Sequence, residues 1–139
     1  MLPVLLLLAG AAFTAPVALT ATSDYELSKN PETLGAYVRE YFADAPIMAN
    51  IAWCESRFRH LNPEGEIFRG KVNDQDIGVM QINIKYHLVR SKELGVDIYS
   101  LKGNLEYAKH LYDTEGNTPW NSSRPCWGKV AVAKKSISI

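Results

Sequence analysis

Glu55 is the side chain in this 139-residue chain that is best placed for acid–base chemistry. It comes near the end of a predicted helix and follows, by one residue, an apolar stripe at helical spacing made by Ile47, Ile51, Cys54 and Phe58. At the edge of a buried face the charged form of a carboxylate is disfavoured, so its pKa rises. A general acid needs a raised pKa near neutral pH, although a plain surface glutamate at a helix end is the alternative.

A second stretch, further along the chain, joins apolar side chains to two side-chain amides and reads Gly78-Val79-Met80-Gln81-Ile82-Asn83. We expect its three apolar residues in the core. From the residues alone, the amides of Gln81 and Asn83 can bond to nearby backbone, and Asn83 can cap a helix that follows it. Asp76, with Asp74 as the weaker candidate, offers a second carboxylate or merely a solvated turn, because aspartate is a turn former.

Together these two stretches resemble the lysozyme-like superfamily, and they are most similar to bacterial lytic transglycosylases and animal lysozymes. The matching features are Glu55-Ser56, then Asp76 and the Gly-x-Met-Gln-Ile-Asn run. A third landmark of the superfamily is an Asn that opens a late helix, followed by an aromatic residue, and Asn104 with Tyr107 fits it. The resemblance covers about residues 44 to 127.

The resemblance implies an α+β, mostly α fold, with a helical core and a small β-hairpin as one lip of an active-site cleft. It also implies cleavage of the β-1,4 bond between N-acetylmuramic acid and N-acetylglucosamine in peptidoglycan, with Glu55 as general acid and base. Asp76 matches the second carboxylate of animal lysozymes. Ser56, Gln81 and Asn83 are then substrate-binding candidates. The usual tyrosine position holds Leu111, so Tyr107 or Tyr112 is expected to take its place.

Trp120 is the candidate for stacking on a sugar ring, because aromatic faces pack well against sugars. A place for Trp120 in the core is the alternative. The enzyme interpretation itself has two rivals, which are a glycan-binding module of the same fold without activity and a small exported structural or inhibitor domain. We expect no cofactor and no metal, because no His or Cys lies at ligand spacing from Cys54 or Cys126.

Helices are expected to position these side chains, with the cations Arg57, Arg59 and His60 complementing the dipole at the end of the second one. The expected helices run over residues 31–42, from an N-cap at Asp44 to about 58, over 84–94, and from an N-cap at Asn104 to 115. The first should bury Leu34, Tyr37, Val38, Tyr41 and Phe42, the third Ile84, Leu88 and Val89, and the fourth Leu105, Ala108, Leu111 and Tyr112. Short strands at 66–69 and 71–73 should form the hairpin.

Composition and the chain ends bound the class of protein. Lys plus Arg and Asp plus Glu are both 15, so no basic field argues for nucleic acid. Residues 1–23 carry no charge and suggest a signal peptide or, if uncleaved, a membrane anchor, followed by one domain at 24–128 and a short tail at 129–139. We therefore expect an exported monomer that binds peptidoglycan glycan strands.

The two cysteines of such an exported domain invite a disulfide between Cys54 and Cys126. That bond would close a loop spanning 126 − 54 = 72 residues and stabilise the fold by about 4 kcal/mol in the chain-entropy account. Two buried free thiols are the alternative.

Overall fold

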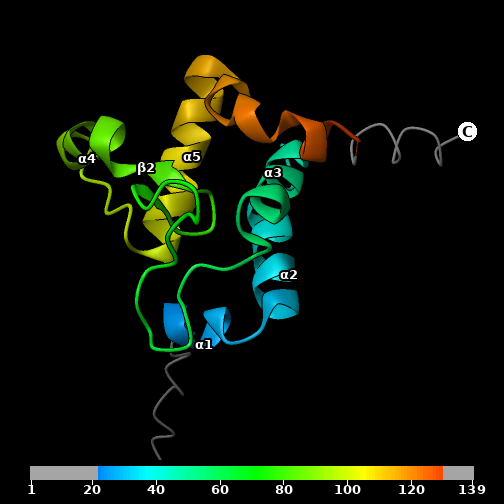
Figure 1. Ribbon diagram of the computed structural model, residues 1–139, viewed down its shortest axis with the longest axis vertical. Coiled ribbons are helices and arrows are strands. Elements are labelled where there is room, and N and C mark those ends of the chain that lie inside the picture. The colour runs from blue at the N-terminus through cyan, green and yellow to red at the C-terminus, as the bar shows by residue number, and fades with distance from the viewer. Residues whose placement is uncertain (1–21, 130–139) are drawn as a thin grey trace, which may run out of the picture.

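The computed structural model describes residues 22–129, which form a mostly helical α+β domain (Figure 1). Its elements in chain order are α1 (Asp24–Ser28), α2 (Pro31–Tyr41), α3 (Ile47–Ser56), β1 (Asp76–Ile77), β2 (Ile82–Asn83), α4 (Ile84–Glu93), α5 (Leu101–Glu115) and the 3-10 helix η1 (Thr118–Ser123). A further helical turn begins at Arg124. Residues 1–21 and 130–139, which hold most of the predicted signal or anchor and of the tail, lie outside the described residues.

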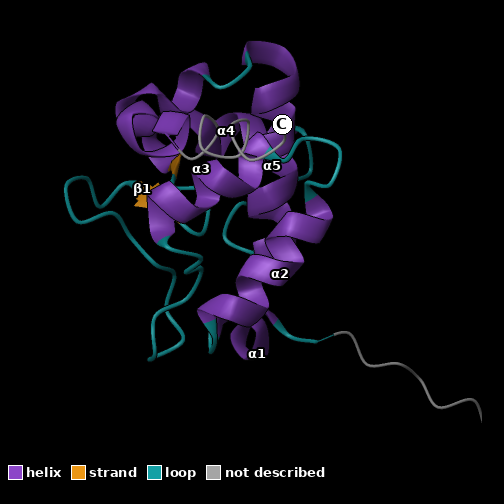
Figure 2. Cartoon of the chain, turned by 90° about the vertical axis from the view of Figure 1, so that its right-hand side faces the viewer, coloured by secondary structure: helices purple, strands orange, loops and turns teal. Residues whose placement is uncertain are grey.

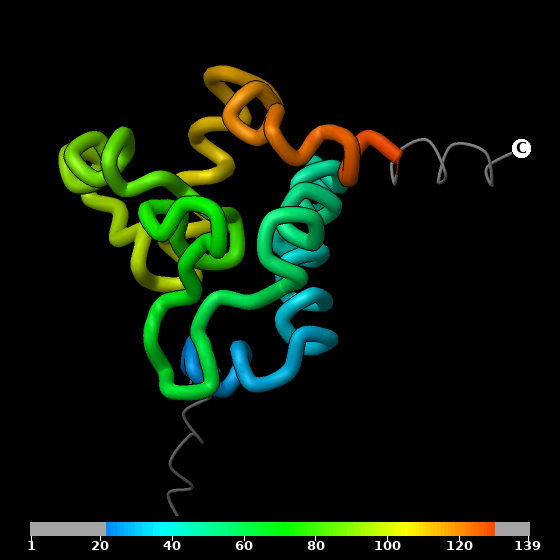
Figure 3. The backbone as a smooth tube through the Cα atoms, viewed as in Figure 1, coloured from blue at the N-terminus to red at the C-terminus, as the bar shows by residue number. Residues whose placement is uncertain are grey.

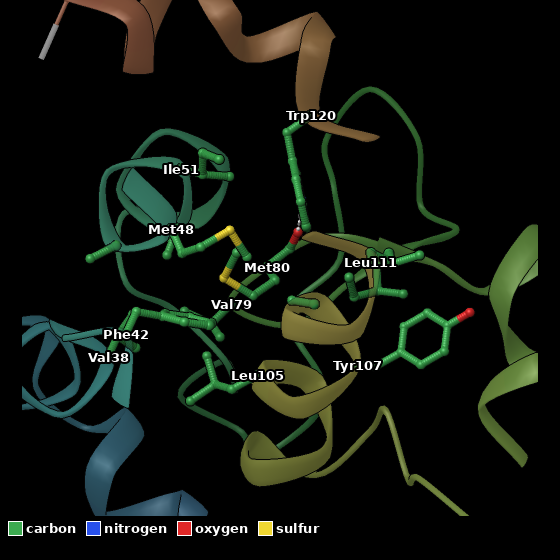
Figure 4. Close-up of a cluster of buried hydrophobic side chains, with 14 of the residues drawn as sticks. Val38, Phe42, Met48, Ile51, Val79, Met80, Leu105, Tyr107, Leu111 and Trp120 are labelled. Carbon is green, nitrogen blue, oxygen red and sulfur yellow. Dashed lines mark hydrogen bonds between the residues drawn. The ribbon is translucent and has the colours of Figure 1, made fainter. Parts of the chain in front are cut away.

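The core lies between α2, α3, α5 and the β1–β2 turn, and η1 closes one end of it. Figure 4 shows Met48 and Ile51 of α3 meeting Met80 of the turn, Leu105 of α5 and Trp120 of η1. All five side chains are buried. Burial of apolar surface on this scale is the main force that holds helices of this length together, because isolated short helices are marginal in water.

The predicted start of α2 is confirmed. Asn30 is the N-cap, its side-chain oxygen accepts a hydrogen bond from the Glu32 N–H at 2.8 Å, and Pro31 occupies the first helical position. The buried side of α2 carries Leu34 and Val38, as the helical spacing predicts.

The N-caps predicted at Asp44 and Asn104 are wrong. The α3 helix begins after Pro46, which takes the cap position without a side-chain hydrogen bond, and Asp44, two residues earlier, points to the Lys109 ammonium at 3.5 Å. The α5 helix begins one turn earlier than expected, with Ser100 as the cap accepting from the Gly103 N–H at 3.0 Å. Asn104 is therefore inside the helix, where its side chain is fully buried.

The predicted hairpin over 66–73 is also wrong. The stretch around Ile67 makes only isolated bridges, to Leu61 on one side and, through Arg69, to Ile77 on the other. The 71–73 stretch fails as a strand because the chain turns back on itself there, with the Gly70 N–H bonded to the Asp76 carbonyl at 2.9 Å. The sheet that exists is β1 paired antiparallel with β2, two residues each, and Figure 2 shows how small it is beside the helices.

The α4 helix fits its predicted span, and Gly95 follows it with a positive φ of 70°. Ile84 and Leu88 pack against the core as expected. Val89 does not, and 73% of its surface is exposed. Ile84 and Leu88 are four residues apart and share one face of the helix, whereas Val89 lies on another face. The packing of α4 buries the first face and leaves Val89 exposed.

The predicted disulfide is confirmed, with Cys54 of α3 bonded to Cys126 and their Cα atoms 5.9 Å apart. It fastens the segment after η1 to the end of α3. In Figure 3 the orange part of the chain, which holds η1 and the segment after it, runs as an arch from the end of α5 across to α3, and the disulfide fastens its far end. Over residues 22–129 no helix is long and apolar enough to cross a membrane.

Candidate active site

Glu55 continues the buried face of α3. It follows Ile51 by four residues and Ala52 by three, and both of these are fully buried. Glu55 itself is half-buried, in the part of the helix that η1 contacts. The Ser123 hydroxyl, at the end of η1, donates a short hydrogen bond to Glu55 Oε1.

The pKa of Glu55 is raised from its ordinary value of 4.5, in the direction that the sequence predicted. Burial is the largest cause, because removing a carboxylate from water disfavours its charged form. The hydrogen bond from Ser123 acts in the opposite direction, and the negative charge of Asp76 raises the pKa further. The negative charge of Asp76 thus acts on the Glu55 carboxyl.

The β1–β2 turn faces α3 and is held by a buried amide. Asn104 Oδ1 accepts from the Met80 N–H at 2.9 Å, and Asn104 Nδ2 donates to the carbonyls of Ile77 at 3.1 Å and Ile98 at 3.0 Å. Gly78 adopts a φ of +71°, and a Cβ there would come within 2.6 Å of Asn104 Nδ2. The glycine and the asparagine therefore require each other.

His60 supports the same turn from the other side, which corrects its predicted role as a cation at a helix end. The ring is fully buried. Its Nδ1 accepts from the Val79 N–H at 3.3 Å, so Nε2 carries the proton and donates to the Tyr99 carbonyl at 3.0 Å. Burial lowers the pKa of His60, which keeps the ring neutral.

Asp76 and Asn83 form a pair at the end of the two-residue ladder. They lie opposite each other in register, and Asn83 Nδ2 donates to Asp76 Oδ1 at 2.7 Å. Asn83 Oδ1 meanwhile accepts from the Lys85 N–H at 3.0 Å, so the predicted cap of α4 is confirmed. The amide thus fixes the orientation of the second carboxyl. Asp74 is exposed and bonds to its neighbour Gln75.

Ser56 is placed for positioning and not for contact with a ligand. It is buried, and its Oγ lies 2.8 Å from the Val79 carbonyl and 3.0 Å from the Ala52 carbonyl. This hydroxyl therefore ties the end of α3 to the turn. Gln81 is half-buried in the left-handed region with a φ of 51°, and its Nε2 donates to the Gly78 carbonyl at 2.9 Å.

The aromatic candidates lie in the core. Trp120 is buried and its Nε1 donates to the Met80 carbonyl at 2.9 Å, so it presents no free face for a sugar to stack on. Tyr107 points away from the Trp120 cluster toward α4 in Figure 4, and its hydroxyl lies 3.1 Å from Nδ1 of His87. Tyr112 is half-buried against the core. Packing explains the position of Trp120, because η1 needs a large apolar side chain to cover the end of the core.

Ser123 is the site residue that the sequence reasoning missed. A signal for it was present, since Ser123 precedes Cys126 by three residues and Cys54 precedes Glu55 by one. A disulfide between the two cysteines brings the serine within a few residues' reach of the glutamate. Among the described residues there is no group of three or more His, Cys, Asp or Glu side chains that could hold a metal ion.

Comparison with known proteins gives no assignment: no family model, no curated protein and no solved structure matches the chain.

Ser123→Ala should raise the pKa of Glu55 further, because the lost hydrogen bond stabilises the ionised carboxylate. The pKa is measured directly by following the Glu55 side-chain carboxyl carbon by NMR across a pH titration. Ser122→Ala is the matched control, since Ser122 is the exposed neighbour. A pKa that stays unchanged or falls in Ser123→Ala would show that the hydroxyl does not act on the carboxylate.

Proposed function

We propose that the chain cleaves the β-1,4 glycosidic bond between N-acetylmuramic acid and N-acetylglucosamine in peptidoglycan, with Glu55 as the general acid and base. The single observation that carries the proposal is a half-buried glutamate with a raised pKa, coupled to a second carboxyl on the facing turn. Its sequence context adds the resemblance to lysozyme-like enzymes, and a lysozyme-like fold is part of the proposal. A mostly helical domain with a small antiparallel turn beside the candidate acid is compatible with it.

The first step is proton transfer. A protonated Glu55 donates to the leaving glycosidic oxygen as the bond to the anomeric carbon breaks, and positive charge develops on that sugar. Burial raises the pKa of Glu55, and a raised pKa is the direction that a general acid working near neutral pH requires.

Ser123 suits both protonation states of the acid. Its Oγ donates to the ionised carboxylate, and the Trp120 carbonyl lies 3.1 Å from the same Oγ. When Glu55 is protonated, the hydroxyl can turn its proton to that carbonyl and accept from the carboxyl. The site therefore leaves neither form of Glu55 without a partner.

Two routes complete the reaction. In the hydrolytic route the Asp76 carboxylate stabilises the positive sugar, and Glu55 then takes a proton from the attacking water. In the transglycosylase route the 6-hydroxyl of the same sugar replaces water and closes a 1,6-anhydro ring. Asp76 is held by Asn83 at 2.7 Å, so its charge has a fixed position in either case.

Digestion of purified peptidoglycan by the chain, followed by mass spectrometry of the soluble products, tests the proposal. New reducing ends are expected from hydrolysis, and ends lighter by one water from anhydro formation. Binding to the wall with no new ends of either kind would contradict cleavage and would instead fit a glycan-binding module.

The proposal includes export of the protein. The disulfide is consistent with export, since such bonds persist in oxidising compartments. The proposal also includes action as a monomer.

Asp76→Asn should separate the two routes. A loss of turnover of about 100-fold or more is expected if the aspartate stabilises a charged sugar, and a loss below about tenfold if the 6-hydroxyl closes the ring. In both cases the pKa of Glu55 should fall, because a neighbouring negative charge is removed. Turnover is measured across pH on one batch of peptidoglycan. Asp74→Asn, at the exposed neighbouring turn, is the control.

A further inference from the structure

Two grooves of about 480 Å³ each meet at Pro31 on the surface. The first lies between α2 and α3, and Arg39 and Trp53 line it. The second lies between α1 and the loop after α3, where Arg59 is part of its wall. The residues that line them do not include Glu55. Trp53 precedes Glu55 by two residues, about 200° around the helix, so the first groove is on the reverse side of α3.

Three exposed arginines are each stacked on an aromatic ring: Arg39 lines the first groove, Arg59 lines the second, and Arg57 lies over Trp53, which lines the first. The guanidinium carbon lies 5.3 Å from the ring centre for Arg39 over Phe58, 4.6 Å for Arg57 over Trp53, and 4.5 Å for Arg59 over Phe68. None of the three forms an ion pair with a carboxylate of residues 22–129. Their positive charge is therefore held in place and not neutralised within the described part of the chain.

The backbone fixes this arrangement. Arg57 and Phe58 both lie in the left-handed region, with φ values of 56° and 55°, although neither is glycine. This reverses the chain at the end of α3, returning the Arg57 guanidinium over Trp53 and packing Phe58 against Gly35. A Cβ at Gly35 would come within 2.7 Å of the Phe58 ring, so the fit is close. Stacked, pre-oriented guanidinium groups lose less freedom when they bind.

The chemistry of the grooves indicates their ligand. A guanidinium fork with free N–H groups binds a carboxylate in two parallel hydrogen bonds, and aromatic walls pack against the apolar faces of sugar rings. Trp53 leaves 40% of its surface exposed, and Glu32 is the one acid among the residues lining the two grooves. Two grooves joined end to end suit an extended chain better than a small molecule.

We propose that these grooves bind a carboxylate-bearing glycan strand, the peptidoglycan of the proposed function, on the side of α3 opposite Glu55. The inference rests on that function for its choice of glycan. The second strand-binding surface holds the protein on the insoluble wall independently of the strand at Glu55. The bound groups are the carboxylates of the strand, which the three arginines meet.

Sedimentation with purified peptidoglycan sacculi, stripped of phosphate-containing polymers, tests the groove. The binding constant is measured in the Glu55→Gln background, so that the wall is not degraded. Arg39→Gln/Arg57→Gln should weaken binding at least about tenfold, because two charge-assisted contacts are lost. Trp53→Ala should weaken binding as well, with thermal unfolding recorded for each variant to establish that it is folded. Arg90→Gln/Lys92→Gln, which removes two charges from α4, is the matched control and should bind as the parent does.

A second arm changes the ligand instead of the protein. Sacculi whose carboxyl groups have been converted to neutral amides should bind the parent as weakly as untreated sacculi bind the arginine variant. Equal binding by the arginine variant and its parent, or undiminished binding to amidated sacculi, would overturn the inference. Binding that appears only when phosphate polymers are left on the wall would overturn it too.

The two proposals fail in different ways. If binding depends on the arginines but no new sugar ends appear, the cleavage proposal is rejected and the groove proposal stands. If new sugar ends appear but binding does not depend on the arginines, the groove proposal is rejected and the cleavage proposal stands.

Discussion

Glu55→Gln abolishes release of glycan fragments from peptidoglycan, with turnover at least about 1,000-fold below that of the parent chain. The amide cannot deliver a proton to the leaving oxygen or take one from the attacking group, and acid–base catalysis is worth about 10² to 10⁴ in rate. Fragments are counted as new sugar ends by mass spectrometry on equal amounts of wall. Glu64→Gln is the matched control, because Glu64 is exposed in the loop after α3.

The same substitution should stabilise the fold at neutral pH, so lost activity cannot be attributed to unfolding. A raised pKa in the folded state means that the free energy of unfolding decreases as pH rises and Glu55 ionises. The stabilisation from the neutral carboxyl is complete below the ordinary glutamate pKa of 4.5 and is lost as pH rises through the raised pKa. The amide that replaces the carboxyl in the variant does not titrate, and its oxygen can still accept from Ser123.

Thermal unfolding of both chains from pH 4 to pH 8 measures this effect. The midpoint of Glu55→Gln should exceed that of the parent above the raised pKa, and the difference should shrink toward pH 4. A difference that grows on acidification would contradict the burial of the carboxyl. If Glu55→Gln still cleaves peptidoglycan, Glu55 is not the general acid, whatever the thermal stability of the variant.

Loss of the disulfide carries the second large effect. Cys54→Ser/Cys126→Ser should lower the free energy of unfolding by about 4 kcal/mol, since the bond closes a loop with a sequence separation of 72. The denatured chain gains the freedom that the bond denied it. Denaturant unfolding of parent and variant gives the difference from the midpoints and slopes.

A reductant should weaken the parent in the same assay and leave the variant unchanged. The loss also reaches the site, because the bond fastens the segment that carries Ser123 beside Glu55. The pKa of Glu55 in the variant should therefore move in the same direction as in Ser123→Ala. A decrease in stability below about 1 kcal/mol would show that packing of Trp120 and Trp127 alone holds the arch.

Local signals in the sequence determined much of the helical framework. The Asn30-Pro31 pair defines a helix start through a cap and a fixed φ, both of which act within a few residues. Helical periodicity likewise predicted that Glu55 lies in a helix, α3, at the edge of its buried face. The raised pKa of Glu55 follows from that position and was predicted in direction. The disulfide was one of two alternatives, and the structure decided between them.

The predictions that failed concern residues whose type suits a local role but which make a contact with a distant segment instead. Asp44 and Asn104 are good caps by type, yet one pairs with Lys109 and the other is drawn into the core to hold the β1–β2 turn. The strand pattern at 66–73 satisfied local preference, but residues 67–70 find their hydrogen-bond partners at Leu61 and in β1, so they do not pair with residues 71–73 as a hairpin would. A sequence window contains no information on which distant group will compete.

The sequence alone therefore determined which residues are candidates for chemistry, because Glu55, Asp76 and the Gly78–Asn83 run are defined by type and spacing. Only the tertiary structure decided what surrounds them. It placed Ser123 on the carboxylate, buried Trp120 and Tyr107, made His60 a neutral support, and stacked three arginines on aromatic rings of α3 and of the loop that follows it. The physical reason is that burial and hydrogen-bond partners arise from contacts between segments far apart in the chain, which local preference does not encode.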